Sequence, residues 1–452
     1  MWIIALCVCL AALATGKAVL QFLSRLNALK EWATVINESQ QLRSQFIYAL
    51  QSVYTSLLEQ LQSDTFFSPP ERKDKAEVPP PPAPTPTAEP KIQKCYRLST
   101  IPADWTPQVV LDALTLELGE EIMSSQPQLS LYPSLDGTSQ ICILKVTNTN
   151  GVLNKLVPKN ATTQRIHLNT VKIILDTDFL GLTPLNSPTG KPVADIIAVT
   201  GLAGHAFGSW RSRETCHMWL QDHLASNLEG SVRILTFGYD SSLLADREEE
   251  PDIMEYCNEL IRQLHLARSS DPDRPLIFMG HSLGCIVICR TMLICLRNPA
   301  HTALFNATRS FFFFGAPHQG IRTEEMEAML TDVQGPHAKT HILLRQLREY
   351  SGFLKQQSEA LGPVWEGRSV FSFYESYLSP TVKKSEKGTW SRDGEMVHLV
   401  RRTSSGLMIP EEVRIPVDAN HSDIVKFAGS SDTTYMKVIF HLQDLIDNTM
   451  SS

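Results

Sequence analysis

The sequence predicts an α/β fold with a mostly parallel sheet covered by helices on both faces, over roughly the last 60 % of the chain. From about residue 190, short apolar runs typical of buried strands alternate with amphipathic helical patterns. A Gly-His-Ser-Leu-Gly segment joins one of these runs to an apolar helix. The runs cover residues 193–200, 232–237, 275–279, 310–314 and 369–373, and helical patterns cover residues 253–266 and 285–296.

Length and composition indicate an ordinary globular protein. The 452 residues allow about three structural units, with 43 % apolar and 20 % charged residues. A net charge of -7 without a long run of one sign argues against a nucleic-acid-binding surface. The nine cysteines include no CxxC pair, which argues against a structural zinc site. Most of them lie in apolar runs, so we expect buried free thiols and a reducing compartment.

Residues 1–16 form a hydrophobic segment for which a signal anchor or targeting role is expected. The stretch from Trp2 to Ala14 is unbroken apolar sequence, but it is too short to span a bilayer unless Lys17 snorkels and the helix extends to Leu23. No acidic residue precedes Glu31, so a mitochondrial signal and a buried helix remain alternatives.

A helical region and a linker follow this segment. Residues 17–63 are free of Gly and Pro, and their apolar residues step by three and four, which predicts amphipathic helices. Residues 64–94 contain seven prolines between positions 79 and 90, which predicts a stiff, extended linker.

Residues 95–178 are predicted to form a small α+β domain with an order close to βαββαβ. Strands are expected at residues 96–99, 129–132, 141–146 and 171–175, and a helix at residues 106–118 that opens on Thr106 and Pro107. RNA-recognition domains share this order, but the run at residues 141–146 lacks their aromatic platform. We therefore expect a packing domain that does not bind RNA.

The chemistry is predicted to centre on Ser282. Gly280 and Gly284 flank it, and a buried strand precedes the motif while an apolar helix follows it. This is the context of the nucleophile elbow of α/β-hydrolases, in which the serine hydroxyl is exposed on a tight strand-to-helix turn. The prediction is an α/β-hydrolase domain over residues 179–447 with Ser282 as its nucleophile.

A serine nucleophile requires a base and an orienting acid, which in this fold follow it in the order acid, then histidine. His421 lies in a polar loop, whereas His398 and His441 lie in a predicted strand and helix, so His421 is the predicted base. Glu375 ends the strand at residues 369–373 and is the predicted acid, with Asp393 and Asp418 as rivals. The interpretation is a Ser-His-Glu triad.

The oxyanion hole of this fold takes two main-chain N–H groups. One is expected from Leu283, directly after the nucleophile. The other is expected from Leu202, in the glycine-flanked loop after the strand at residues 193–200. No metal constellation or phosphate-binding loop is evident, so no cofactor is implied.

Several blocks resemble the fungal branch of the serine-active-site-containing α/β-hydrolases, which is related to lipid-acting and GPI-inositol-deacylase-like hydrolases. The similarity covers about residues 95–445, and its blocks are DIIAVTGLAGHAFGSW, MWL, TFGYD, RPLIFMGHSLG, FFGAPHQG, FYE and HSDIVKF. The resemblance implies an esterase or lipase-like acyl hydrolase and carries over Ser282, Glu375 and His421. Two positions depart from the family pattern: Cys285 stands where Gly is usual, and Thr200 where His is frequent.

The expected function is a serine esterase or lipase-like hydrolase acting on a lipid-related ester, without nucleic acid and with unspecified oligomeric state. The alternative is a catalytically silent hydrolase-fold protein that acts as an interaction module. A helical insertion over residues 323–361 is expected to form a lid or an acyl-pocket wall. Membrane association through the N-terminus is expected, with the hydrolase domain facing the cytosol at the endoplasmic reticulum or mitochondrion.

Overall fold

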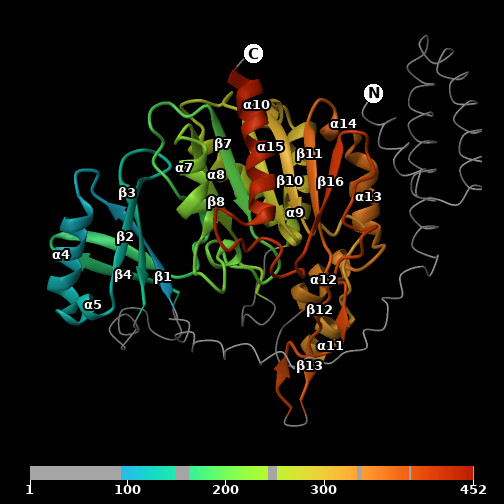
Figure 1. Cartoon of the computed structure of the whole chain (residues 1–452), viewed down its shortest axis with the longest axis horizontal. Coiled ribbons are helices and arrows are strands. Elements are labelled where there is room, and N and C mark those ends of the chain that lie inside the picture. Colours follow the sequence, from blue (N-terminus) through green and yellow to red (C-terminus); the bar gives the residue numbers. More distant parts are fainter. Residues whose placement is uncertain (1–92, 148–161, 243–251, 333–337, 386–387, 451–452) are drawn as a thin grey trace, which may run out of the picture. The chain divides into compact units, whose positions relative to one another are not determined.

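The computed structural model describes residues 93–147, 162–242, 252–332, 338–385 and 388–450 (Figure 1). The predicted N-terminal segment of residues 1–16, the helical region of residues 17–63 and nearly all of the linker lie outside the described residues. The described chain forms two main sheets, one of five strands and one of seven, together with two short two-stranded pairings.

The five-stranded sheet is antiparallel, with strand order β2-β3-β1-β5-β4. Helix α4 (Pro107–Leu118) packs Val110, Ala113 and Leu114 into its core. As predicted, Thr106 caps this helix, because its hydroxyl oxygen accepts a hydrogen bond from the Val109 N–H at 3.3 Å. The remaining elements are β1 (Lys94–Ile101), α5 (Glu121–Ser124), β2 (Gln128–Pro133), β3 (Gln140–Val146), β4 (Thr163–Leu168) and β5 (Val171–Asp176).

This sheet contains one strand that the sequence did not predict. Strand β4 alternates exposed polar with buried apolar residues and forms a hairpin with β5. The turn passes through Asn169, whose φ of 54° suits a tight two-residue hairpin. The second helix expected in the βαββαβ order would fall before β4, where residues 148–161 are outside the described part.

The seven-stranded sheet has the order β16-β11-β10-β9-β7-β8-β6, and every neighbouring pair is parallel except β6 with β8. Helices cover it on both sides, which confirms the predicted α/β-hydrolase fold class (Figure 1). The strands are β6 (Gly181–Pro184), β7 (Ala194–Val199), β8 (Val232–Gly238), β9 (Leu276–His281), β10 (Thr308–Phe314), β11 (Ser369–Glu375) and β16 (Glu412–Val417).

The two edge strands, β6 and β16, were not predicted, because β6 has only four residues, β16 is partly exposed, and each contains a proline. Proline is confined to edge strands, where one side of the backbone has no sheet partner. The strand expected around His398 is wrong. Only Met396–Val397 (β15) is extended there, and it pairs with Ser379–Pro380 (β12) outside the main sheet.

Successive residues of the central strands enter opposite cores. Phe311 and Phe313 of β10 face one core, and Phe312 and Phe314 face the other. The first core is covered by α8 (Ile253–Ala267), α9 (Leu283–Arg297), α10 (Thr302–Ala307), α12 (Ala338–Leu347), α13 (Gly352–Ala360) and α14 (Gly362–Trp365). The second is covered by η2 (Gly208–Trp210), η3 (Leu220–Leu224) and α15 (Thr433–Met450). Burial on both faces explains why these strands are mostly apolar.

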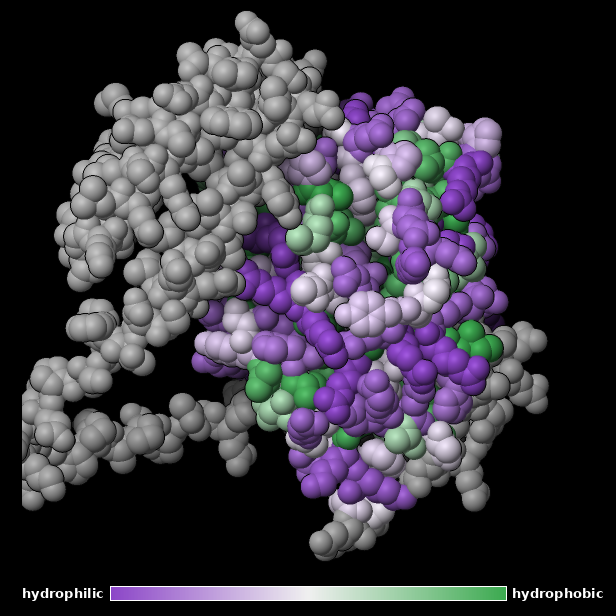
Figure 2. Space-filling model, turned by 90° about the vertical axis from the view of Figure 1, so that its right-hand side faces the viewer, coloured by the Kyte–Doolittle hydropathy of each residue, from purple (hydrophilic) through white to green (hydrophobic). Residues whose placement is uncertain are grey.

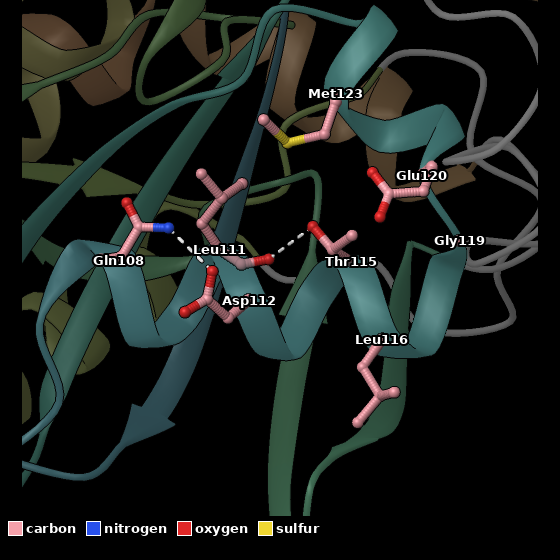
Figure 3. Close-up of a pocket in the computed structure, with 8 residues that line it drawn as sticks. All are labelled: Gln108, Leu111, Asp112, Thr115, Leu116, Gly119, Glu120 and Met123. Carbon is pink, nitrogen blue, oxygen red and sulfur yellow. Dashed lines mark hydrogen bonds between the residues drawn. The ribbon is translucent and has the colours of Figure 1, made fainter.

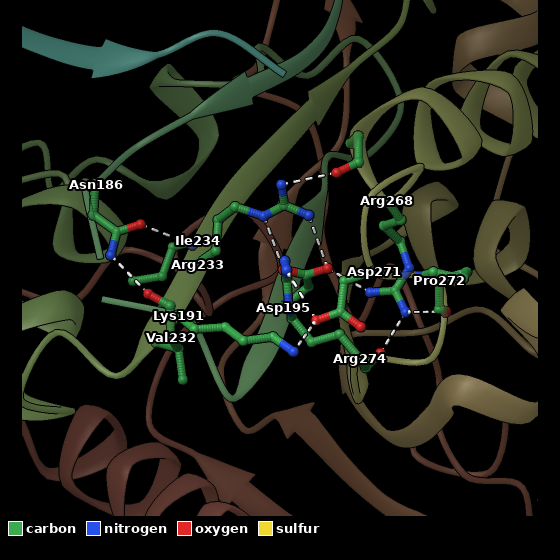
Figure 4. A network of polar contacts seen from close by, with 11 residues as sticks. Asn186, Lys191, Asp195, Val232, Arg233, Ile234, Arg268, Asp271, Pro272 and Arg274 are labelled. Atoms are coloured by element: carbon green, nitrogen blue, oxygen red, sulfur yellow. Dashed lines mark hydrogen bonds and ion pairs between the residues drawn. The ribbon is translucent and has the colours of Figure 1, made fainter. Parts of the chain in front are cut away.

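A buried ionic cluster holds the amino end of β7 (Figure 4). Asp195 is fully buried and accepts hydrogen bonds from three guanidinium groups. Arg233 lies 2.8 and 2.9 Å from its two oxygens and Arg274 lies at 3.0 Å, while Arg268 is the third partner. The cluster links β7 to β8 and to the segment before β9, at the end of the sheet opposite the strands' carboxyl ends.

The small sheet packs against the larger one through apolar and ionic contacts. Ile143 of β3 belongs to the second core of the hydrolase part. Lys145 Nζ lies 2.9 Å from Asp222 Oδ1, and Arg97 Nη1 donates to Thr183 Oγ1 at 2.6 Å. These contacts support the predicted packing role of the small domain.

The molecular surface carries scattered apolar residues. On the face that Figure 2 shows, hydrophilic residues predominate and hydrophobic residues lie in small separate groups. Among the described helices, no single one is long and apolar enough to cross a membrane. By length and composition alone, one bent pair passes that test, namely Leu283–Arg297 with Pro299–Ala307.

Candidate active site

Ser282 lies in the tight turn between β9 and α9. Its backbone has φ 52° and ψ -123°, which L-residues rarely adopt and which fits the strained turn of a nucleophile elbow. The flanking glycines make the turn possible. A Cβ on Gly280 would lie 2.9 Å from Cys285 Cα, and a Cβ on Gly284 would collide with the Val199 carbonyl oxygen.

The structure brings the three predicted side chains into one hydrogen-bonded chain. Ser282 Oγ lies 2.9 Å from His421 Nε2, and His421 Nδ1 lies 2.8 Å from Glu375 Oε2. The exposed fractions of the three residues are only 5 to 6 %. Because the Glu375 carboxylate accepts from Nδ1–H, Nε2 of the neutral ring is free to accept the Ser282 hydroxyl proton. The second carboxylate oxygen, Oε1, accepts the Val400 N–H at 3.2 Å.

Parallel strands explain why these residues meet. Ser282 follows β9, Glu375 ends β11 and His421 lies in the loop after β16, so all three belong to the carboxyl edge of one sheet. The rival acids do not reach this point: Asp418 is exposed, and Asp393 is exposed and accepts from the Ser391 hydroxyl. The alternative bases lie elsewhere as well: His398 is exposed, and His441 lies on α15, where its ring packs against Phe371.

Two further residues shape the site and were missed by the sequence analysis. Gly315 follows β10 with φ 56°, and a Cβ there would lie 3.0 Å from His421 Nδ1. Ser379 accepts the main-chain N–H of His421 at 3.0 Å through its hydroxyl oxygen. Gly315 is the first glycine of the FFGAPHQG block, so the sequence carried a signal for it. No local pattern pointed to Ser379.

Leu202 lies in the loop after β7 and lines the cavity beside Ser282, and Leu283 directly follows Ser282 as the first residue of α9. In the part of the chain that the structure describes, neither main-chain N–H donates a hydrogen bond. The neighbouring amide of Ala203 is already used, because it donates to Ser241 at 3.0 Å. The loop is further fixed by the Tyr239 hydroxyl, which donates to the Thr200 carbonyl at 2.8 Å.

Both departures from the family pattern are accommodated. Cys285 is buried, its Sγ faces the Phe314 carbonyl at 3.9 Å, and burial raises the pKa of its thiol well above the usual range. The Cys285 thiol is therefore not a second nucleophile. Thr200 Oγ1 lies 2.7 Å from Ser209 Oγ and so contributes to the same loop. The seven described cysteines are free, and five of them are buried.

A cavity of about 770 Å³ opens above Ser282. Its walls combine the loop after β7, the loop around His421 and the start of the helical insertion, where Glu325 and Met326 of α11 (Glu324–Asp332) line it. The later helices of the insertion belong to the core, since α12 and α13 bury Leu347 and Leu354. The insertion therefore supplies one cavity wall through its first helix.

The cavity wall carries more cationic than anionic side chains. Its charged lining residues are Arg211, Arg213, Arg322, Arg392, Lys426, Glu325 and Asp423. Arg213 and Lys426 share Asp423, at 3.6 and 3.4 Å respectively. Burial, and then the neighbouring Arg213, lower the pKa of the Lys426 ammonium group.

A second hollow, of about 520 Å³, lies along α4 of the small domain (Figure 3). Its hydrogen bonds are local ones within the helix, such as Gln108 Nε2 to Asp112 Oδ1 at 2.7 Å. Its lining holds the carboxylates of Asp112 and Glu120 but no nucleophile paired with a base. Of these two hollows, the one above Ser282 therefore contains the hydrogen-bonded serine and histidine.

Comparison with solved structures gives distant likenesses. The mature lipase BlEst2 of Bacillus licheniformis is 14 % identical, with a TM-score of 0.37 over 57 % of this chain and 97 % of that one. Phospholipase PlaB of Legionella pneumophila is 12 % identical, with a TM-score of 0.34 over 48 % of this chain and 45 % of that one.

Comparison of sequences gives closer matches, although no protein-family model matches the chain. Protein SERAC1 of Bos taurus is 25 % identical over 285 residues, or 57 % of this chain and 40 % of that protein. Protein SERAC1 of Mus musculus is 29 % identical over 264 residues, or 53 % and 37 %. The chain thus spans about two fifths of the length of these curated relatives. It is a distant sequence relative of Protein SERAC1 over somewhat more than half of its own length.

Proposed function

We propose that this chain is a serine hydrolase that cleaves a carboxylic ester of a lipid-related substrate. The observation that carries the proposal is the buried chain Ser282–His421–Glu375, with contacts of 2.9 and 2.8 Å, at the floor of a cavity of about 770 Å³. A cavity of this size accommodates a small organic ligand. The lipid-related part rests on the resemblance to lipid-acting hydrolases, and the relation to the fungal and GPI-inositol-deacylase-like branches remains a prediction.

The proposed reaction has two steps. Ser282 Oγ attacks the ester carbonyl carbon while His421 Nε2 takes its proton, and the resulting oxyanion lies at the Leu202 and Leu283 amides. His421 then returns the proton to the leaving alcohol, which leaves an acyl-serine. In the second step His421 takes a proton from water, the hydroxide attacks the acyl group, and the acid departs as Ser282 regains its proton. Glu375 holds the ring and offsets the imidazolium charge.

A fluorophosphonate probe tests this function, because it labels only an activated serine. We expect the wild-type protein to be labelled and S282A to be unlabelled. The matched control is S212A, since Ser212 lines the same cavity without contacting His421 and should be labelled like the wild type. A folded wild-type protein that resists labelling would favour the silent interaction protein instead.

We further propose that the N-terminal segment of residues 1–16 attaches the protein to the endoplasmic reticulum or mitochondrial membrane. In this proposal the hydrolase domain faces the cytosol. The support is the apolar stretch from Trp2 to Ala14 and the set of free, mostly buried cysteines downstream.

A further inference from the structure

The residue before the nucleophile contacts the main chain of the base. His281 is the last residue of β9 and lines the cavity above Ser282. Its Nε2 lies 2.9 Å from the carbonyl oxygen of His421. A carbonyl oxygen only accepts hydrogen bonds, so the His281 ring carries its proton on Nε2 and donates it there. Ser282 and His421 are therefore linked in two ways. The Ser282 hydroxyl contacts the His421 ring, and His281, the residue before Ser282, contacts the His421 main chain.

This contact completes a set that fixes His421 from several sides. The main-chain N–H of His421 donates to Ser379 Oγ at 3.0 Å, and its carbonyl accepts from His281. Its ring is oriented by Glu375 at one nitrogen and faces Ser282 at the other. Because His421 lies in a loop between β16 and α15, no strand or helix ladder holds its backbone, and these hydrogen bonds replace one.

His281 remains a neutral donor throughout the working range of an esterase. Burial and the neighbouring His421 lower the pKa of the His281 imidazole to about 3. The two rings lie 5.3 Å apart between centroids, so a second positive charge there would oppose the imidazolium that His421 forms during turnover. A neutral imidazole supplies the hydrogen bond without that repulsion.

We propose that His281 is a positioning residue for the hydrolysis described above: its Nε2–H holds the His421 main chain so that His421 Nε2 stays within hydrogen-bond distance of the Ser282 hydroxyl. This inference rests on the proposed function. Among the described residues, His281 is the donor to the His421 carbonyl, and Gly201 leaves room for it, since a Cβ at Gly201 would lie 3.1 Å from His281 Nδ1.

Three substitutions separate the hydrogen bond from ring packing. H281F keeps a planar ring of similar size but removes the donor. H281Q places an amide nitrogen at the position of Nε2, whereas the shorter H281N places it near the position of Nδ1. The matched control is H441F, because His441 lies on α15, outside the cavity, where its ring packs against Phe371 of β11. For each full-length variant we would measure kcat and KM on a p-nitrophenyl ester, the rate of fluorophosphonate labelling, and Tm.

We expect H281F and H281N to lower kcat and the labelling rate by about 10- to 100-fold, the effect of misplacing a catalytic group by about 1 Å, with KM little changed. H281Q should recover most of the wild-type kcat, and H441F should match the wild type. Wild-type kcat in H281F would overturn the inference, as would an H281Q variant as slow as H281F. If H281F fails to fold, the comparison of kcat between H281Q and H281N tests the inference instead: H281Q should be close to the wild type, and an H281Q variant as slow as H281N would overturn the inference. An unlabelled, inactive wild-type protein would instead overturn the proposed function, and this inference with it.

Discussion

Glu375 Oε2 lies 2.8 Å from His421 Nδ1, although 46 residues separate the two in the chain. The other carboxylate oxygen accepts the Val400 N–H, so the carboxylate is held in place independently of the histidine. This arrangement fixes the ring tautomer in which Nε2 is free to act on Ser282. In the proposed triad, Ser282 thus acts as the nucleophile, His421 as the base and Glu375 as the group that orients the base, and substitutions can test these roles separately.

Substitutions in the proposed triad should rank by role. S282A and H421A should each lower kcat by about 10⁶-fold, as in comparable triads. E375Q should cost less, because it removes only the orientation and charge support of the ring. D393N and D418N, which alter exposed carboxylates, serve as controls in a kcat assay. Full activity in E375Q together with loss in either control would show that the acid is misassigned.

Asp195 should be important for stability but not for chemistry. D195N leaves three guanidinium groups around a neutral amide in a fully buried site, so we expect a loss of about 3 to 5 kcal/mol in the free energy of unfolding. D271N should cost less, since Asp271 is more exposed and pairs with Arg274 at 3.3 Å. Urea unfolding measures both. Equal stability of D195N and wild type would contradict this account, as would a loss of kcat in folded D195N.

His318 should contribute to acid sensitivity. Burial lowers the pKa of this imidazole to about 3, from an ordinary value of 6.5. Below pH 6.5 the unfolded chain binds a proton that the folded chain does not, so stability falls as the pH drops towards 3, by at most about 5 kcal/mol. H318F keeps an aromatic ring beside Phe313 and should flatten the decline between pH 7 and pH 5 in urea unfolding. H398F, at an exposed position, is the control and should follow the wild-type slope.

The N-terminal proposal is tested by deletion. Removing residues 1–30 should release the protein from membranes and leave esterase activity intact, because the proline-rich linker separates the two parts of the chain. Fractionation of cells, followed by an ester assay on the soluble fraction, measures both effects. A deletion variant that pellets with membranes as fully as the wild type would contradict the proposal.

The orientation proposal is tested by glycan analysis. Four Asn-x-Ser/Thr sequons occur, at Asn37, Asn160, Asn306 and Asn420. Asn420 lines the cavity, and its Nδ2 donates to Asp423 Oδ2 at 3.0 Å. A glycan on that nitrogen would break the contact and obstruct the cavity beside His421. Mass spectrometry of the native protein should therefore find Asn160, Asn306 and Asn420 unmodified, and an occupied site on active protein would refute a cytosolic hydrolase domain.

The sequence by itself determined those features that depend on neighbouring residues. The elbow at Ser282 is one, because its strand, its two glycines and its helix are contiguous. The cap of α4 by Thr106 is another, because a cap involves residues three positions apart. The five central strands were predicted because burial on both faces makes each of them a mostly apolar run. The edge strands were missed, because β6 has only four residues, β16 is partly exposed, and each contains a proline.

Only the tertiary structure decided which distant residues meet. Glu375 was distinguished from Asp393 and Asp418 by the position of its strand in the sheet, which places its carboxylate beside His421. The contact of His281 with the His421 carbonyl spans 140 residues and leaves no local pattern. The physical reason is the same in each case. Strand order and the path of the loops at the carboxyl edge of the sheet determine which of these residues lie close together. Packing of the whole domain in turn determines the strand order and the loop paths.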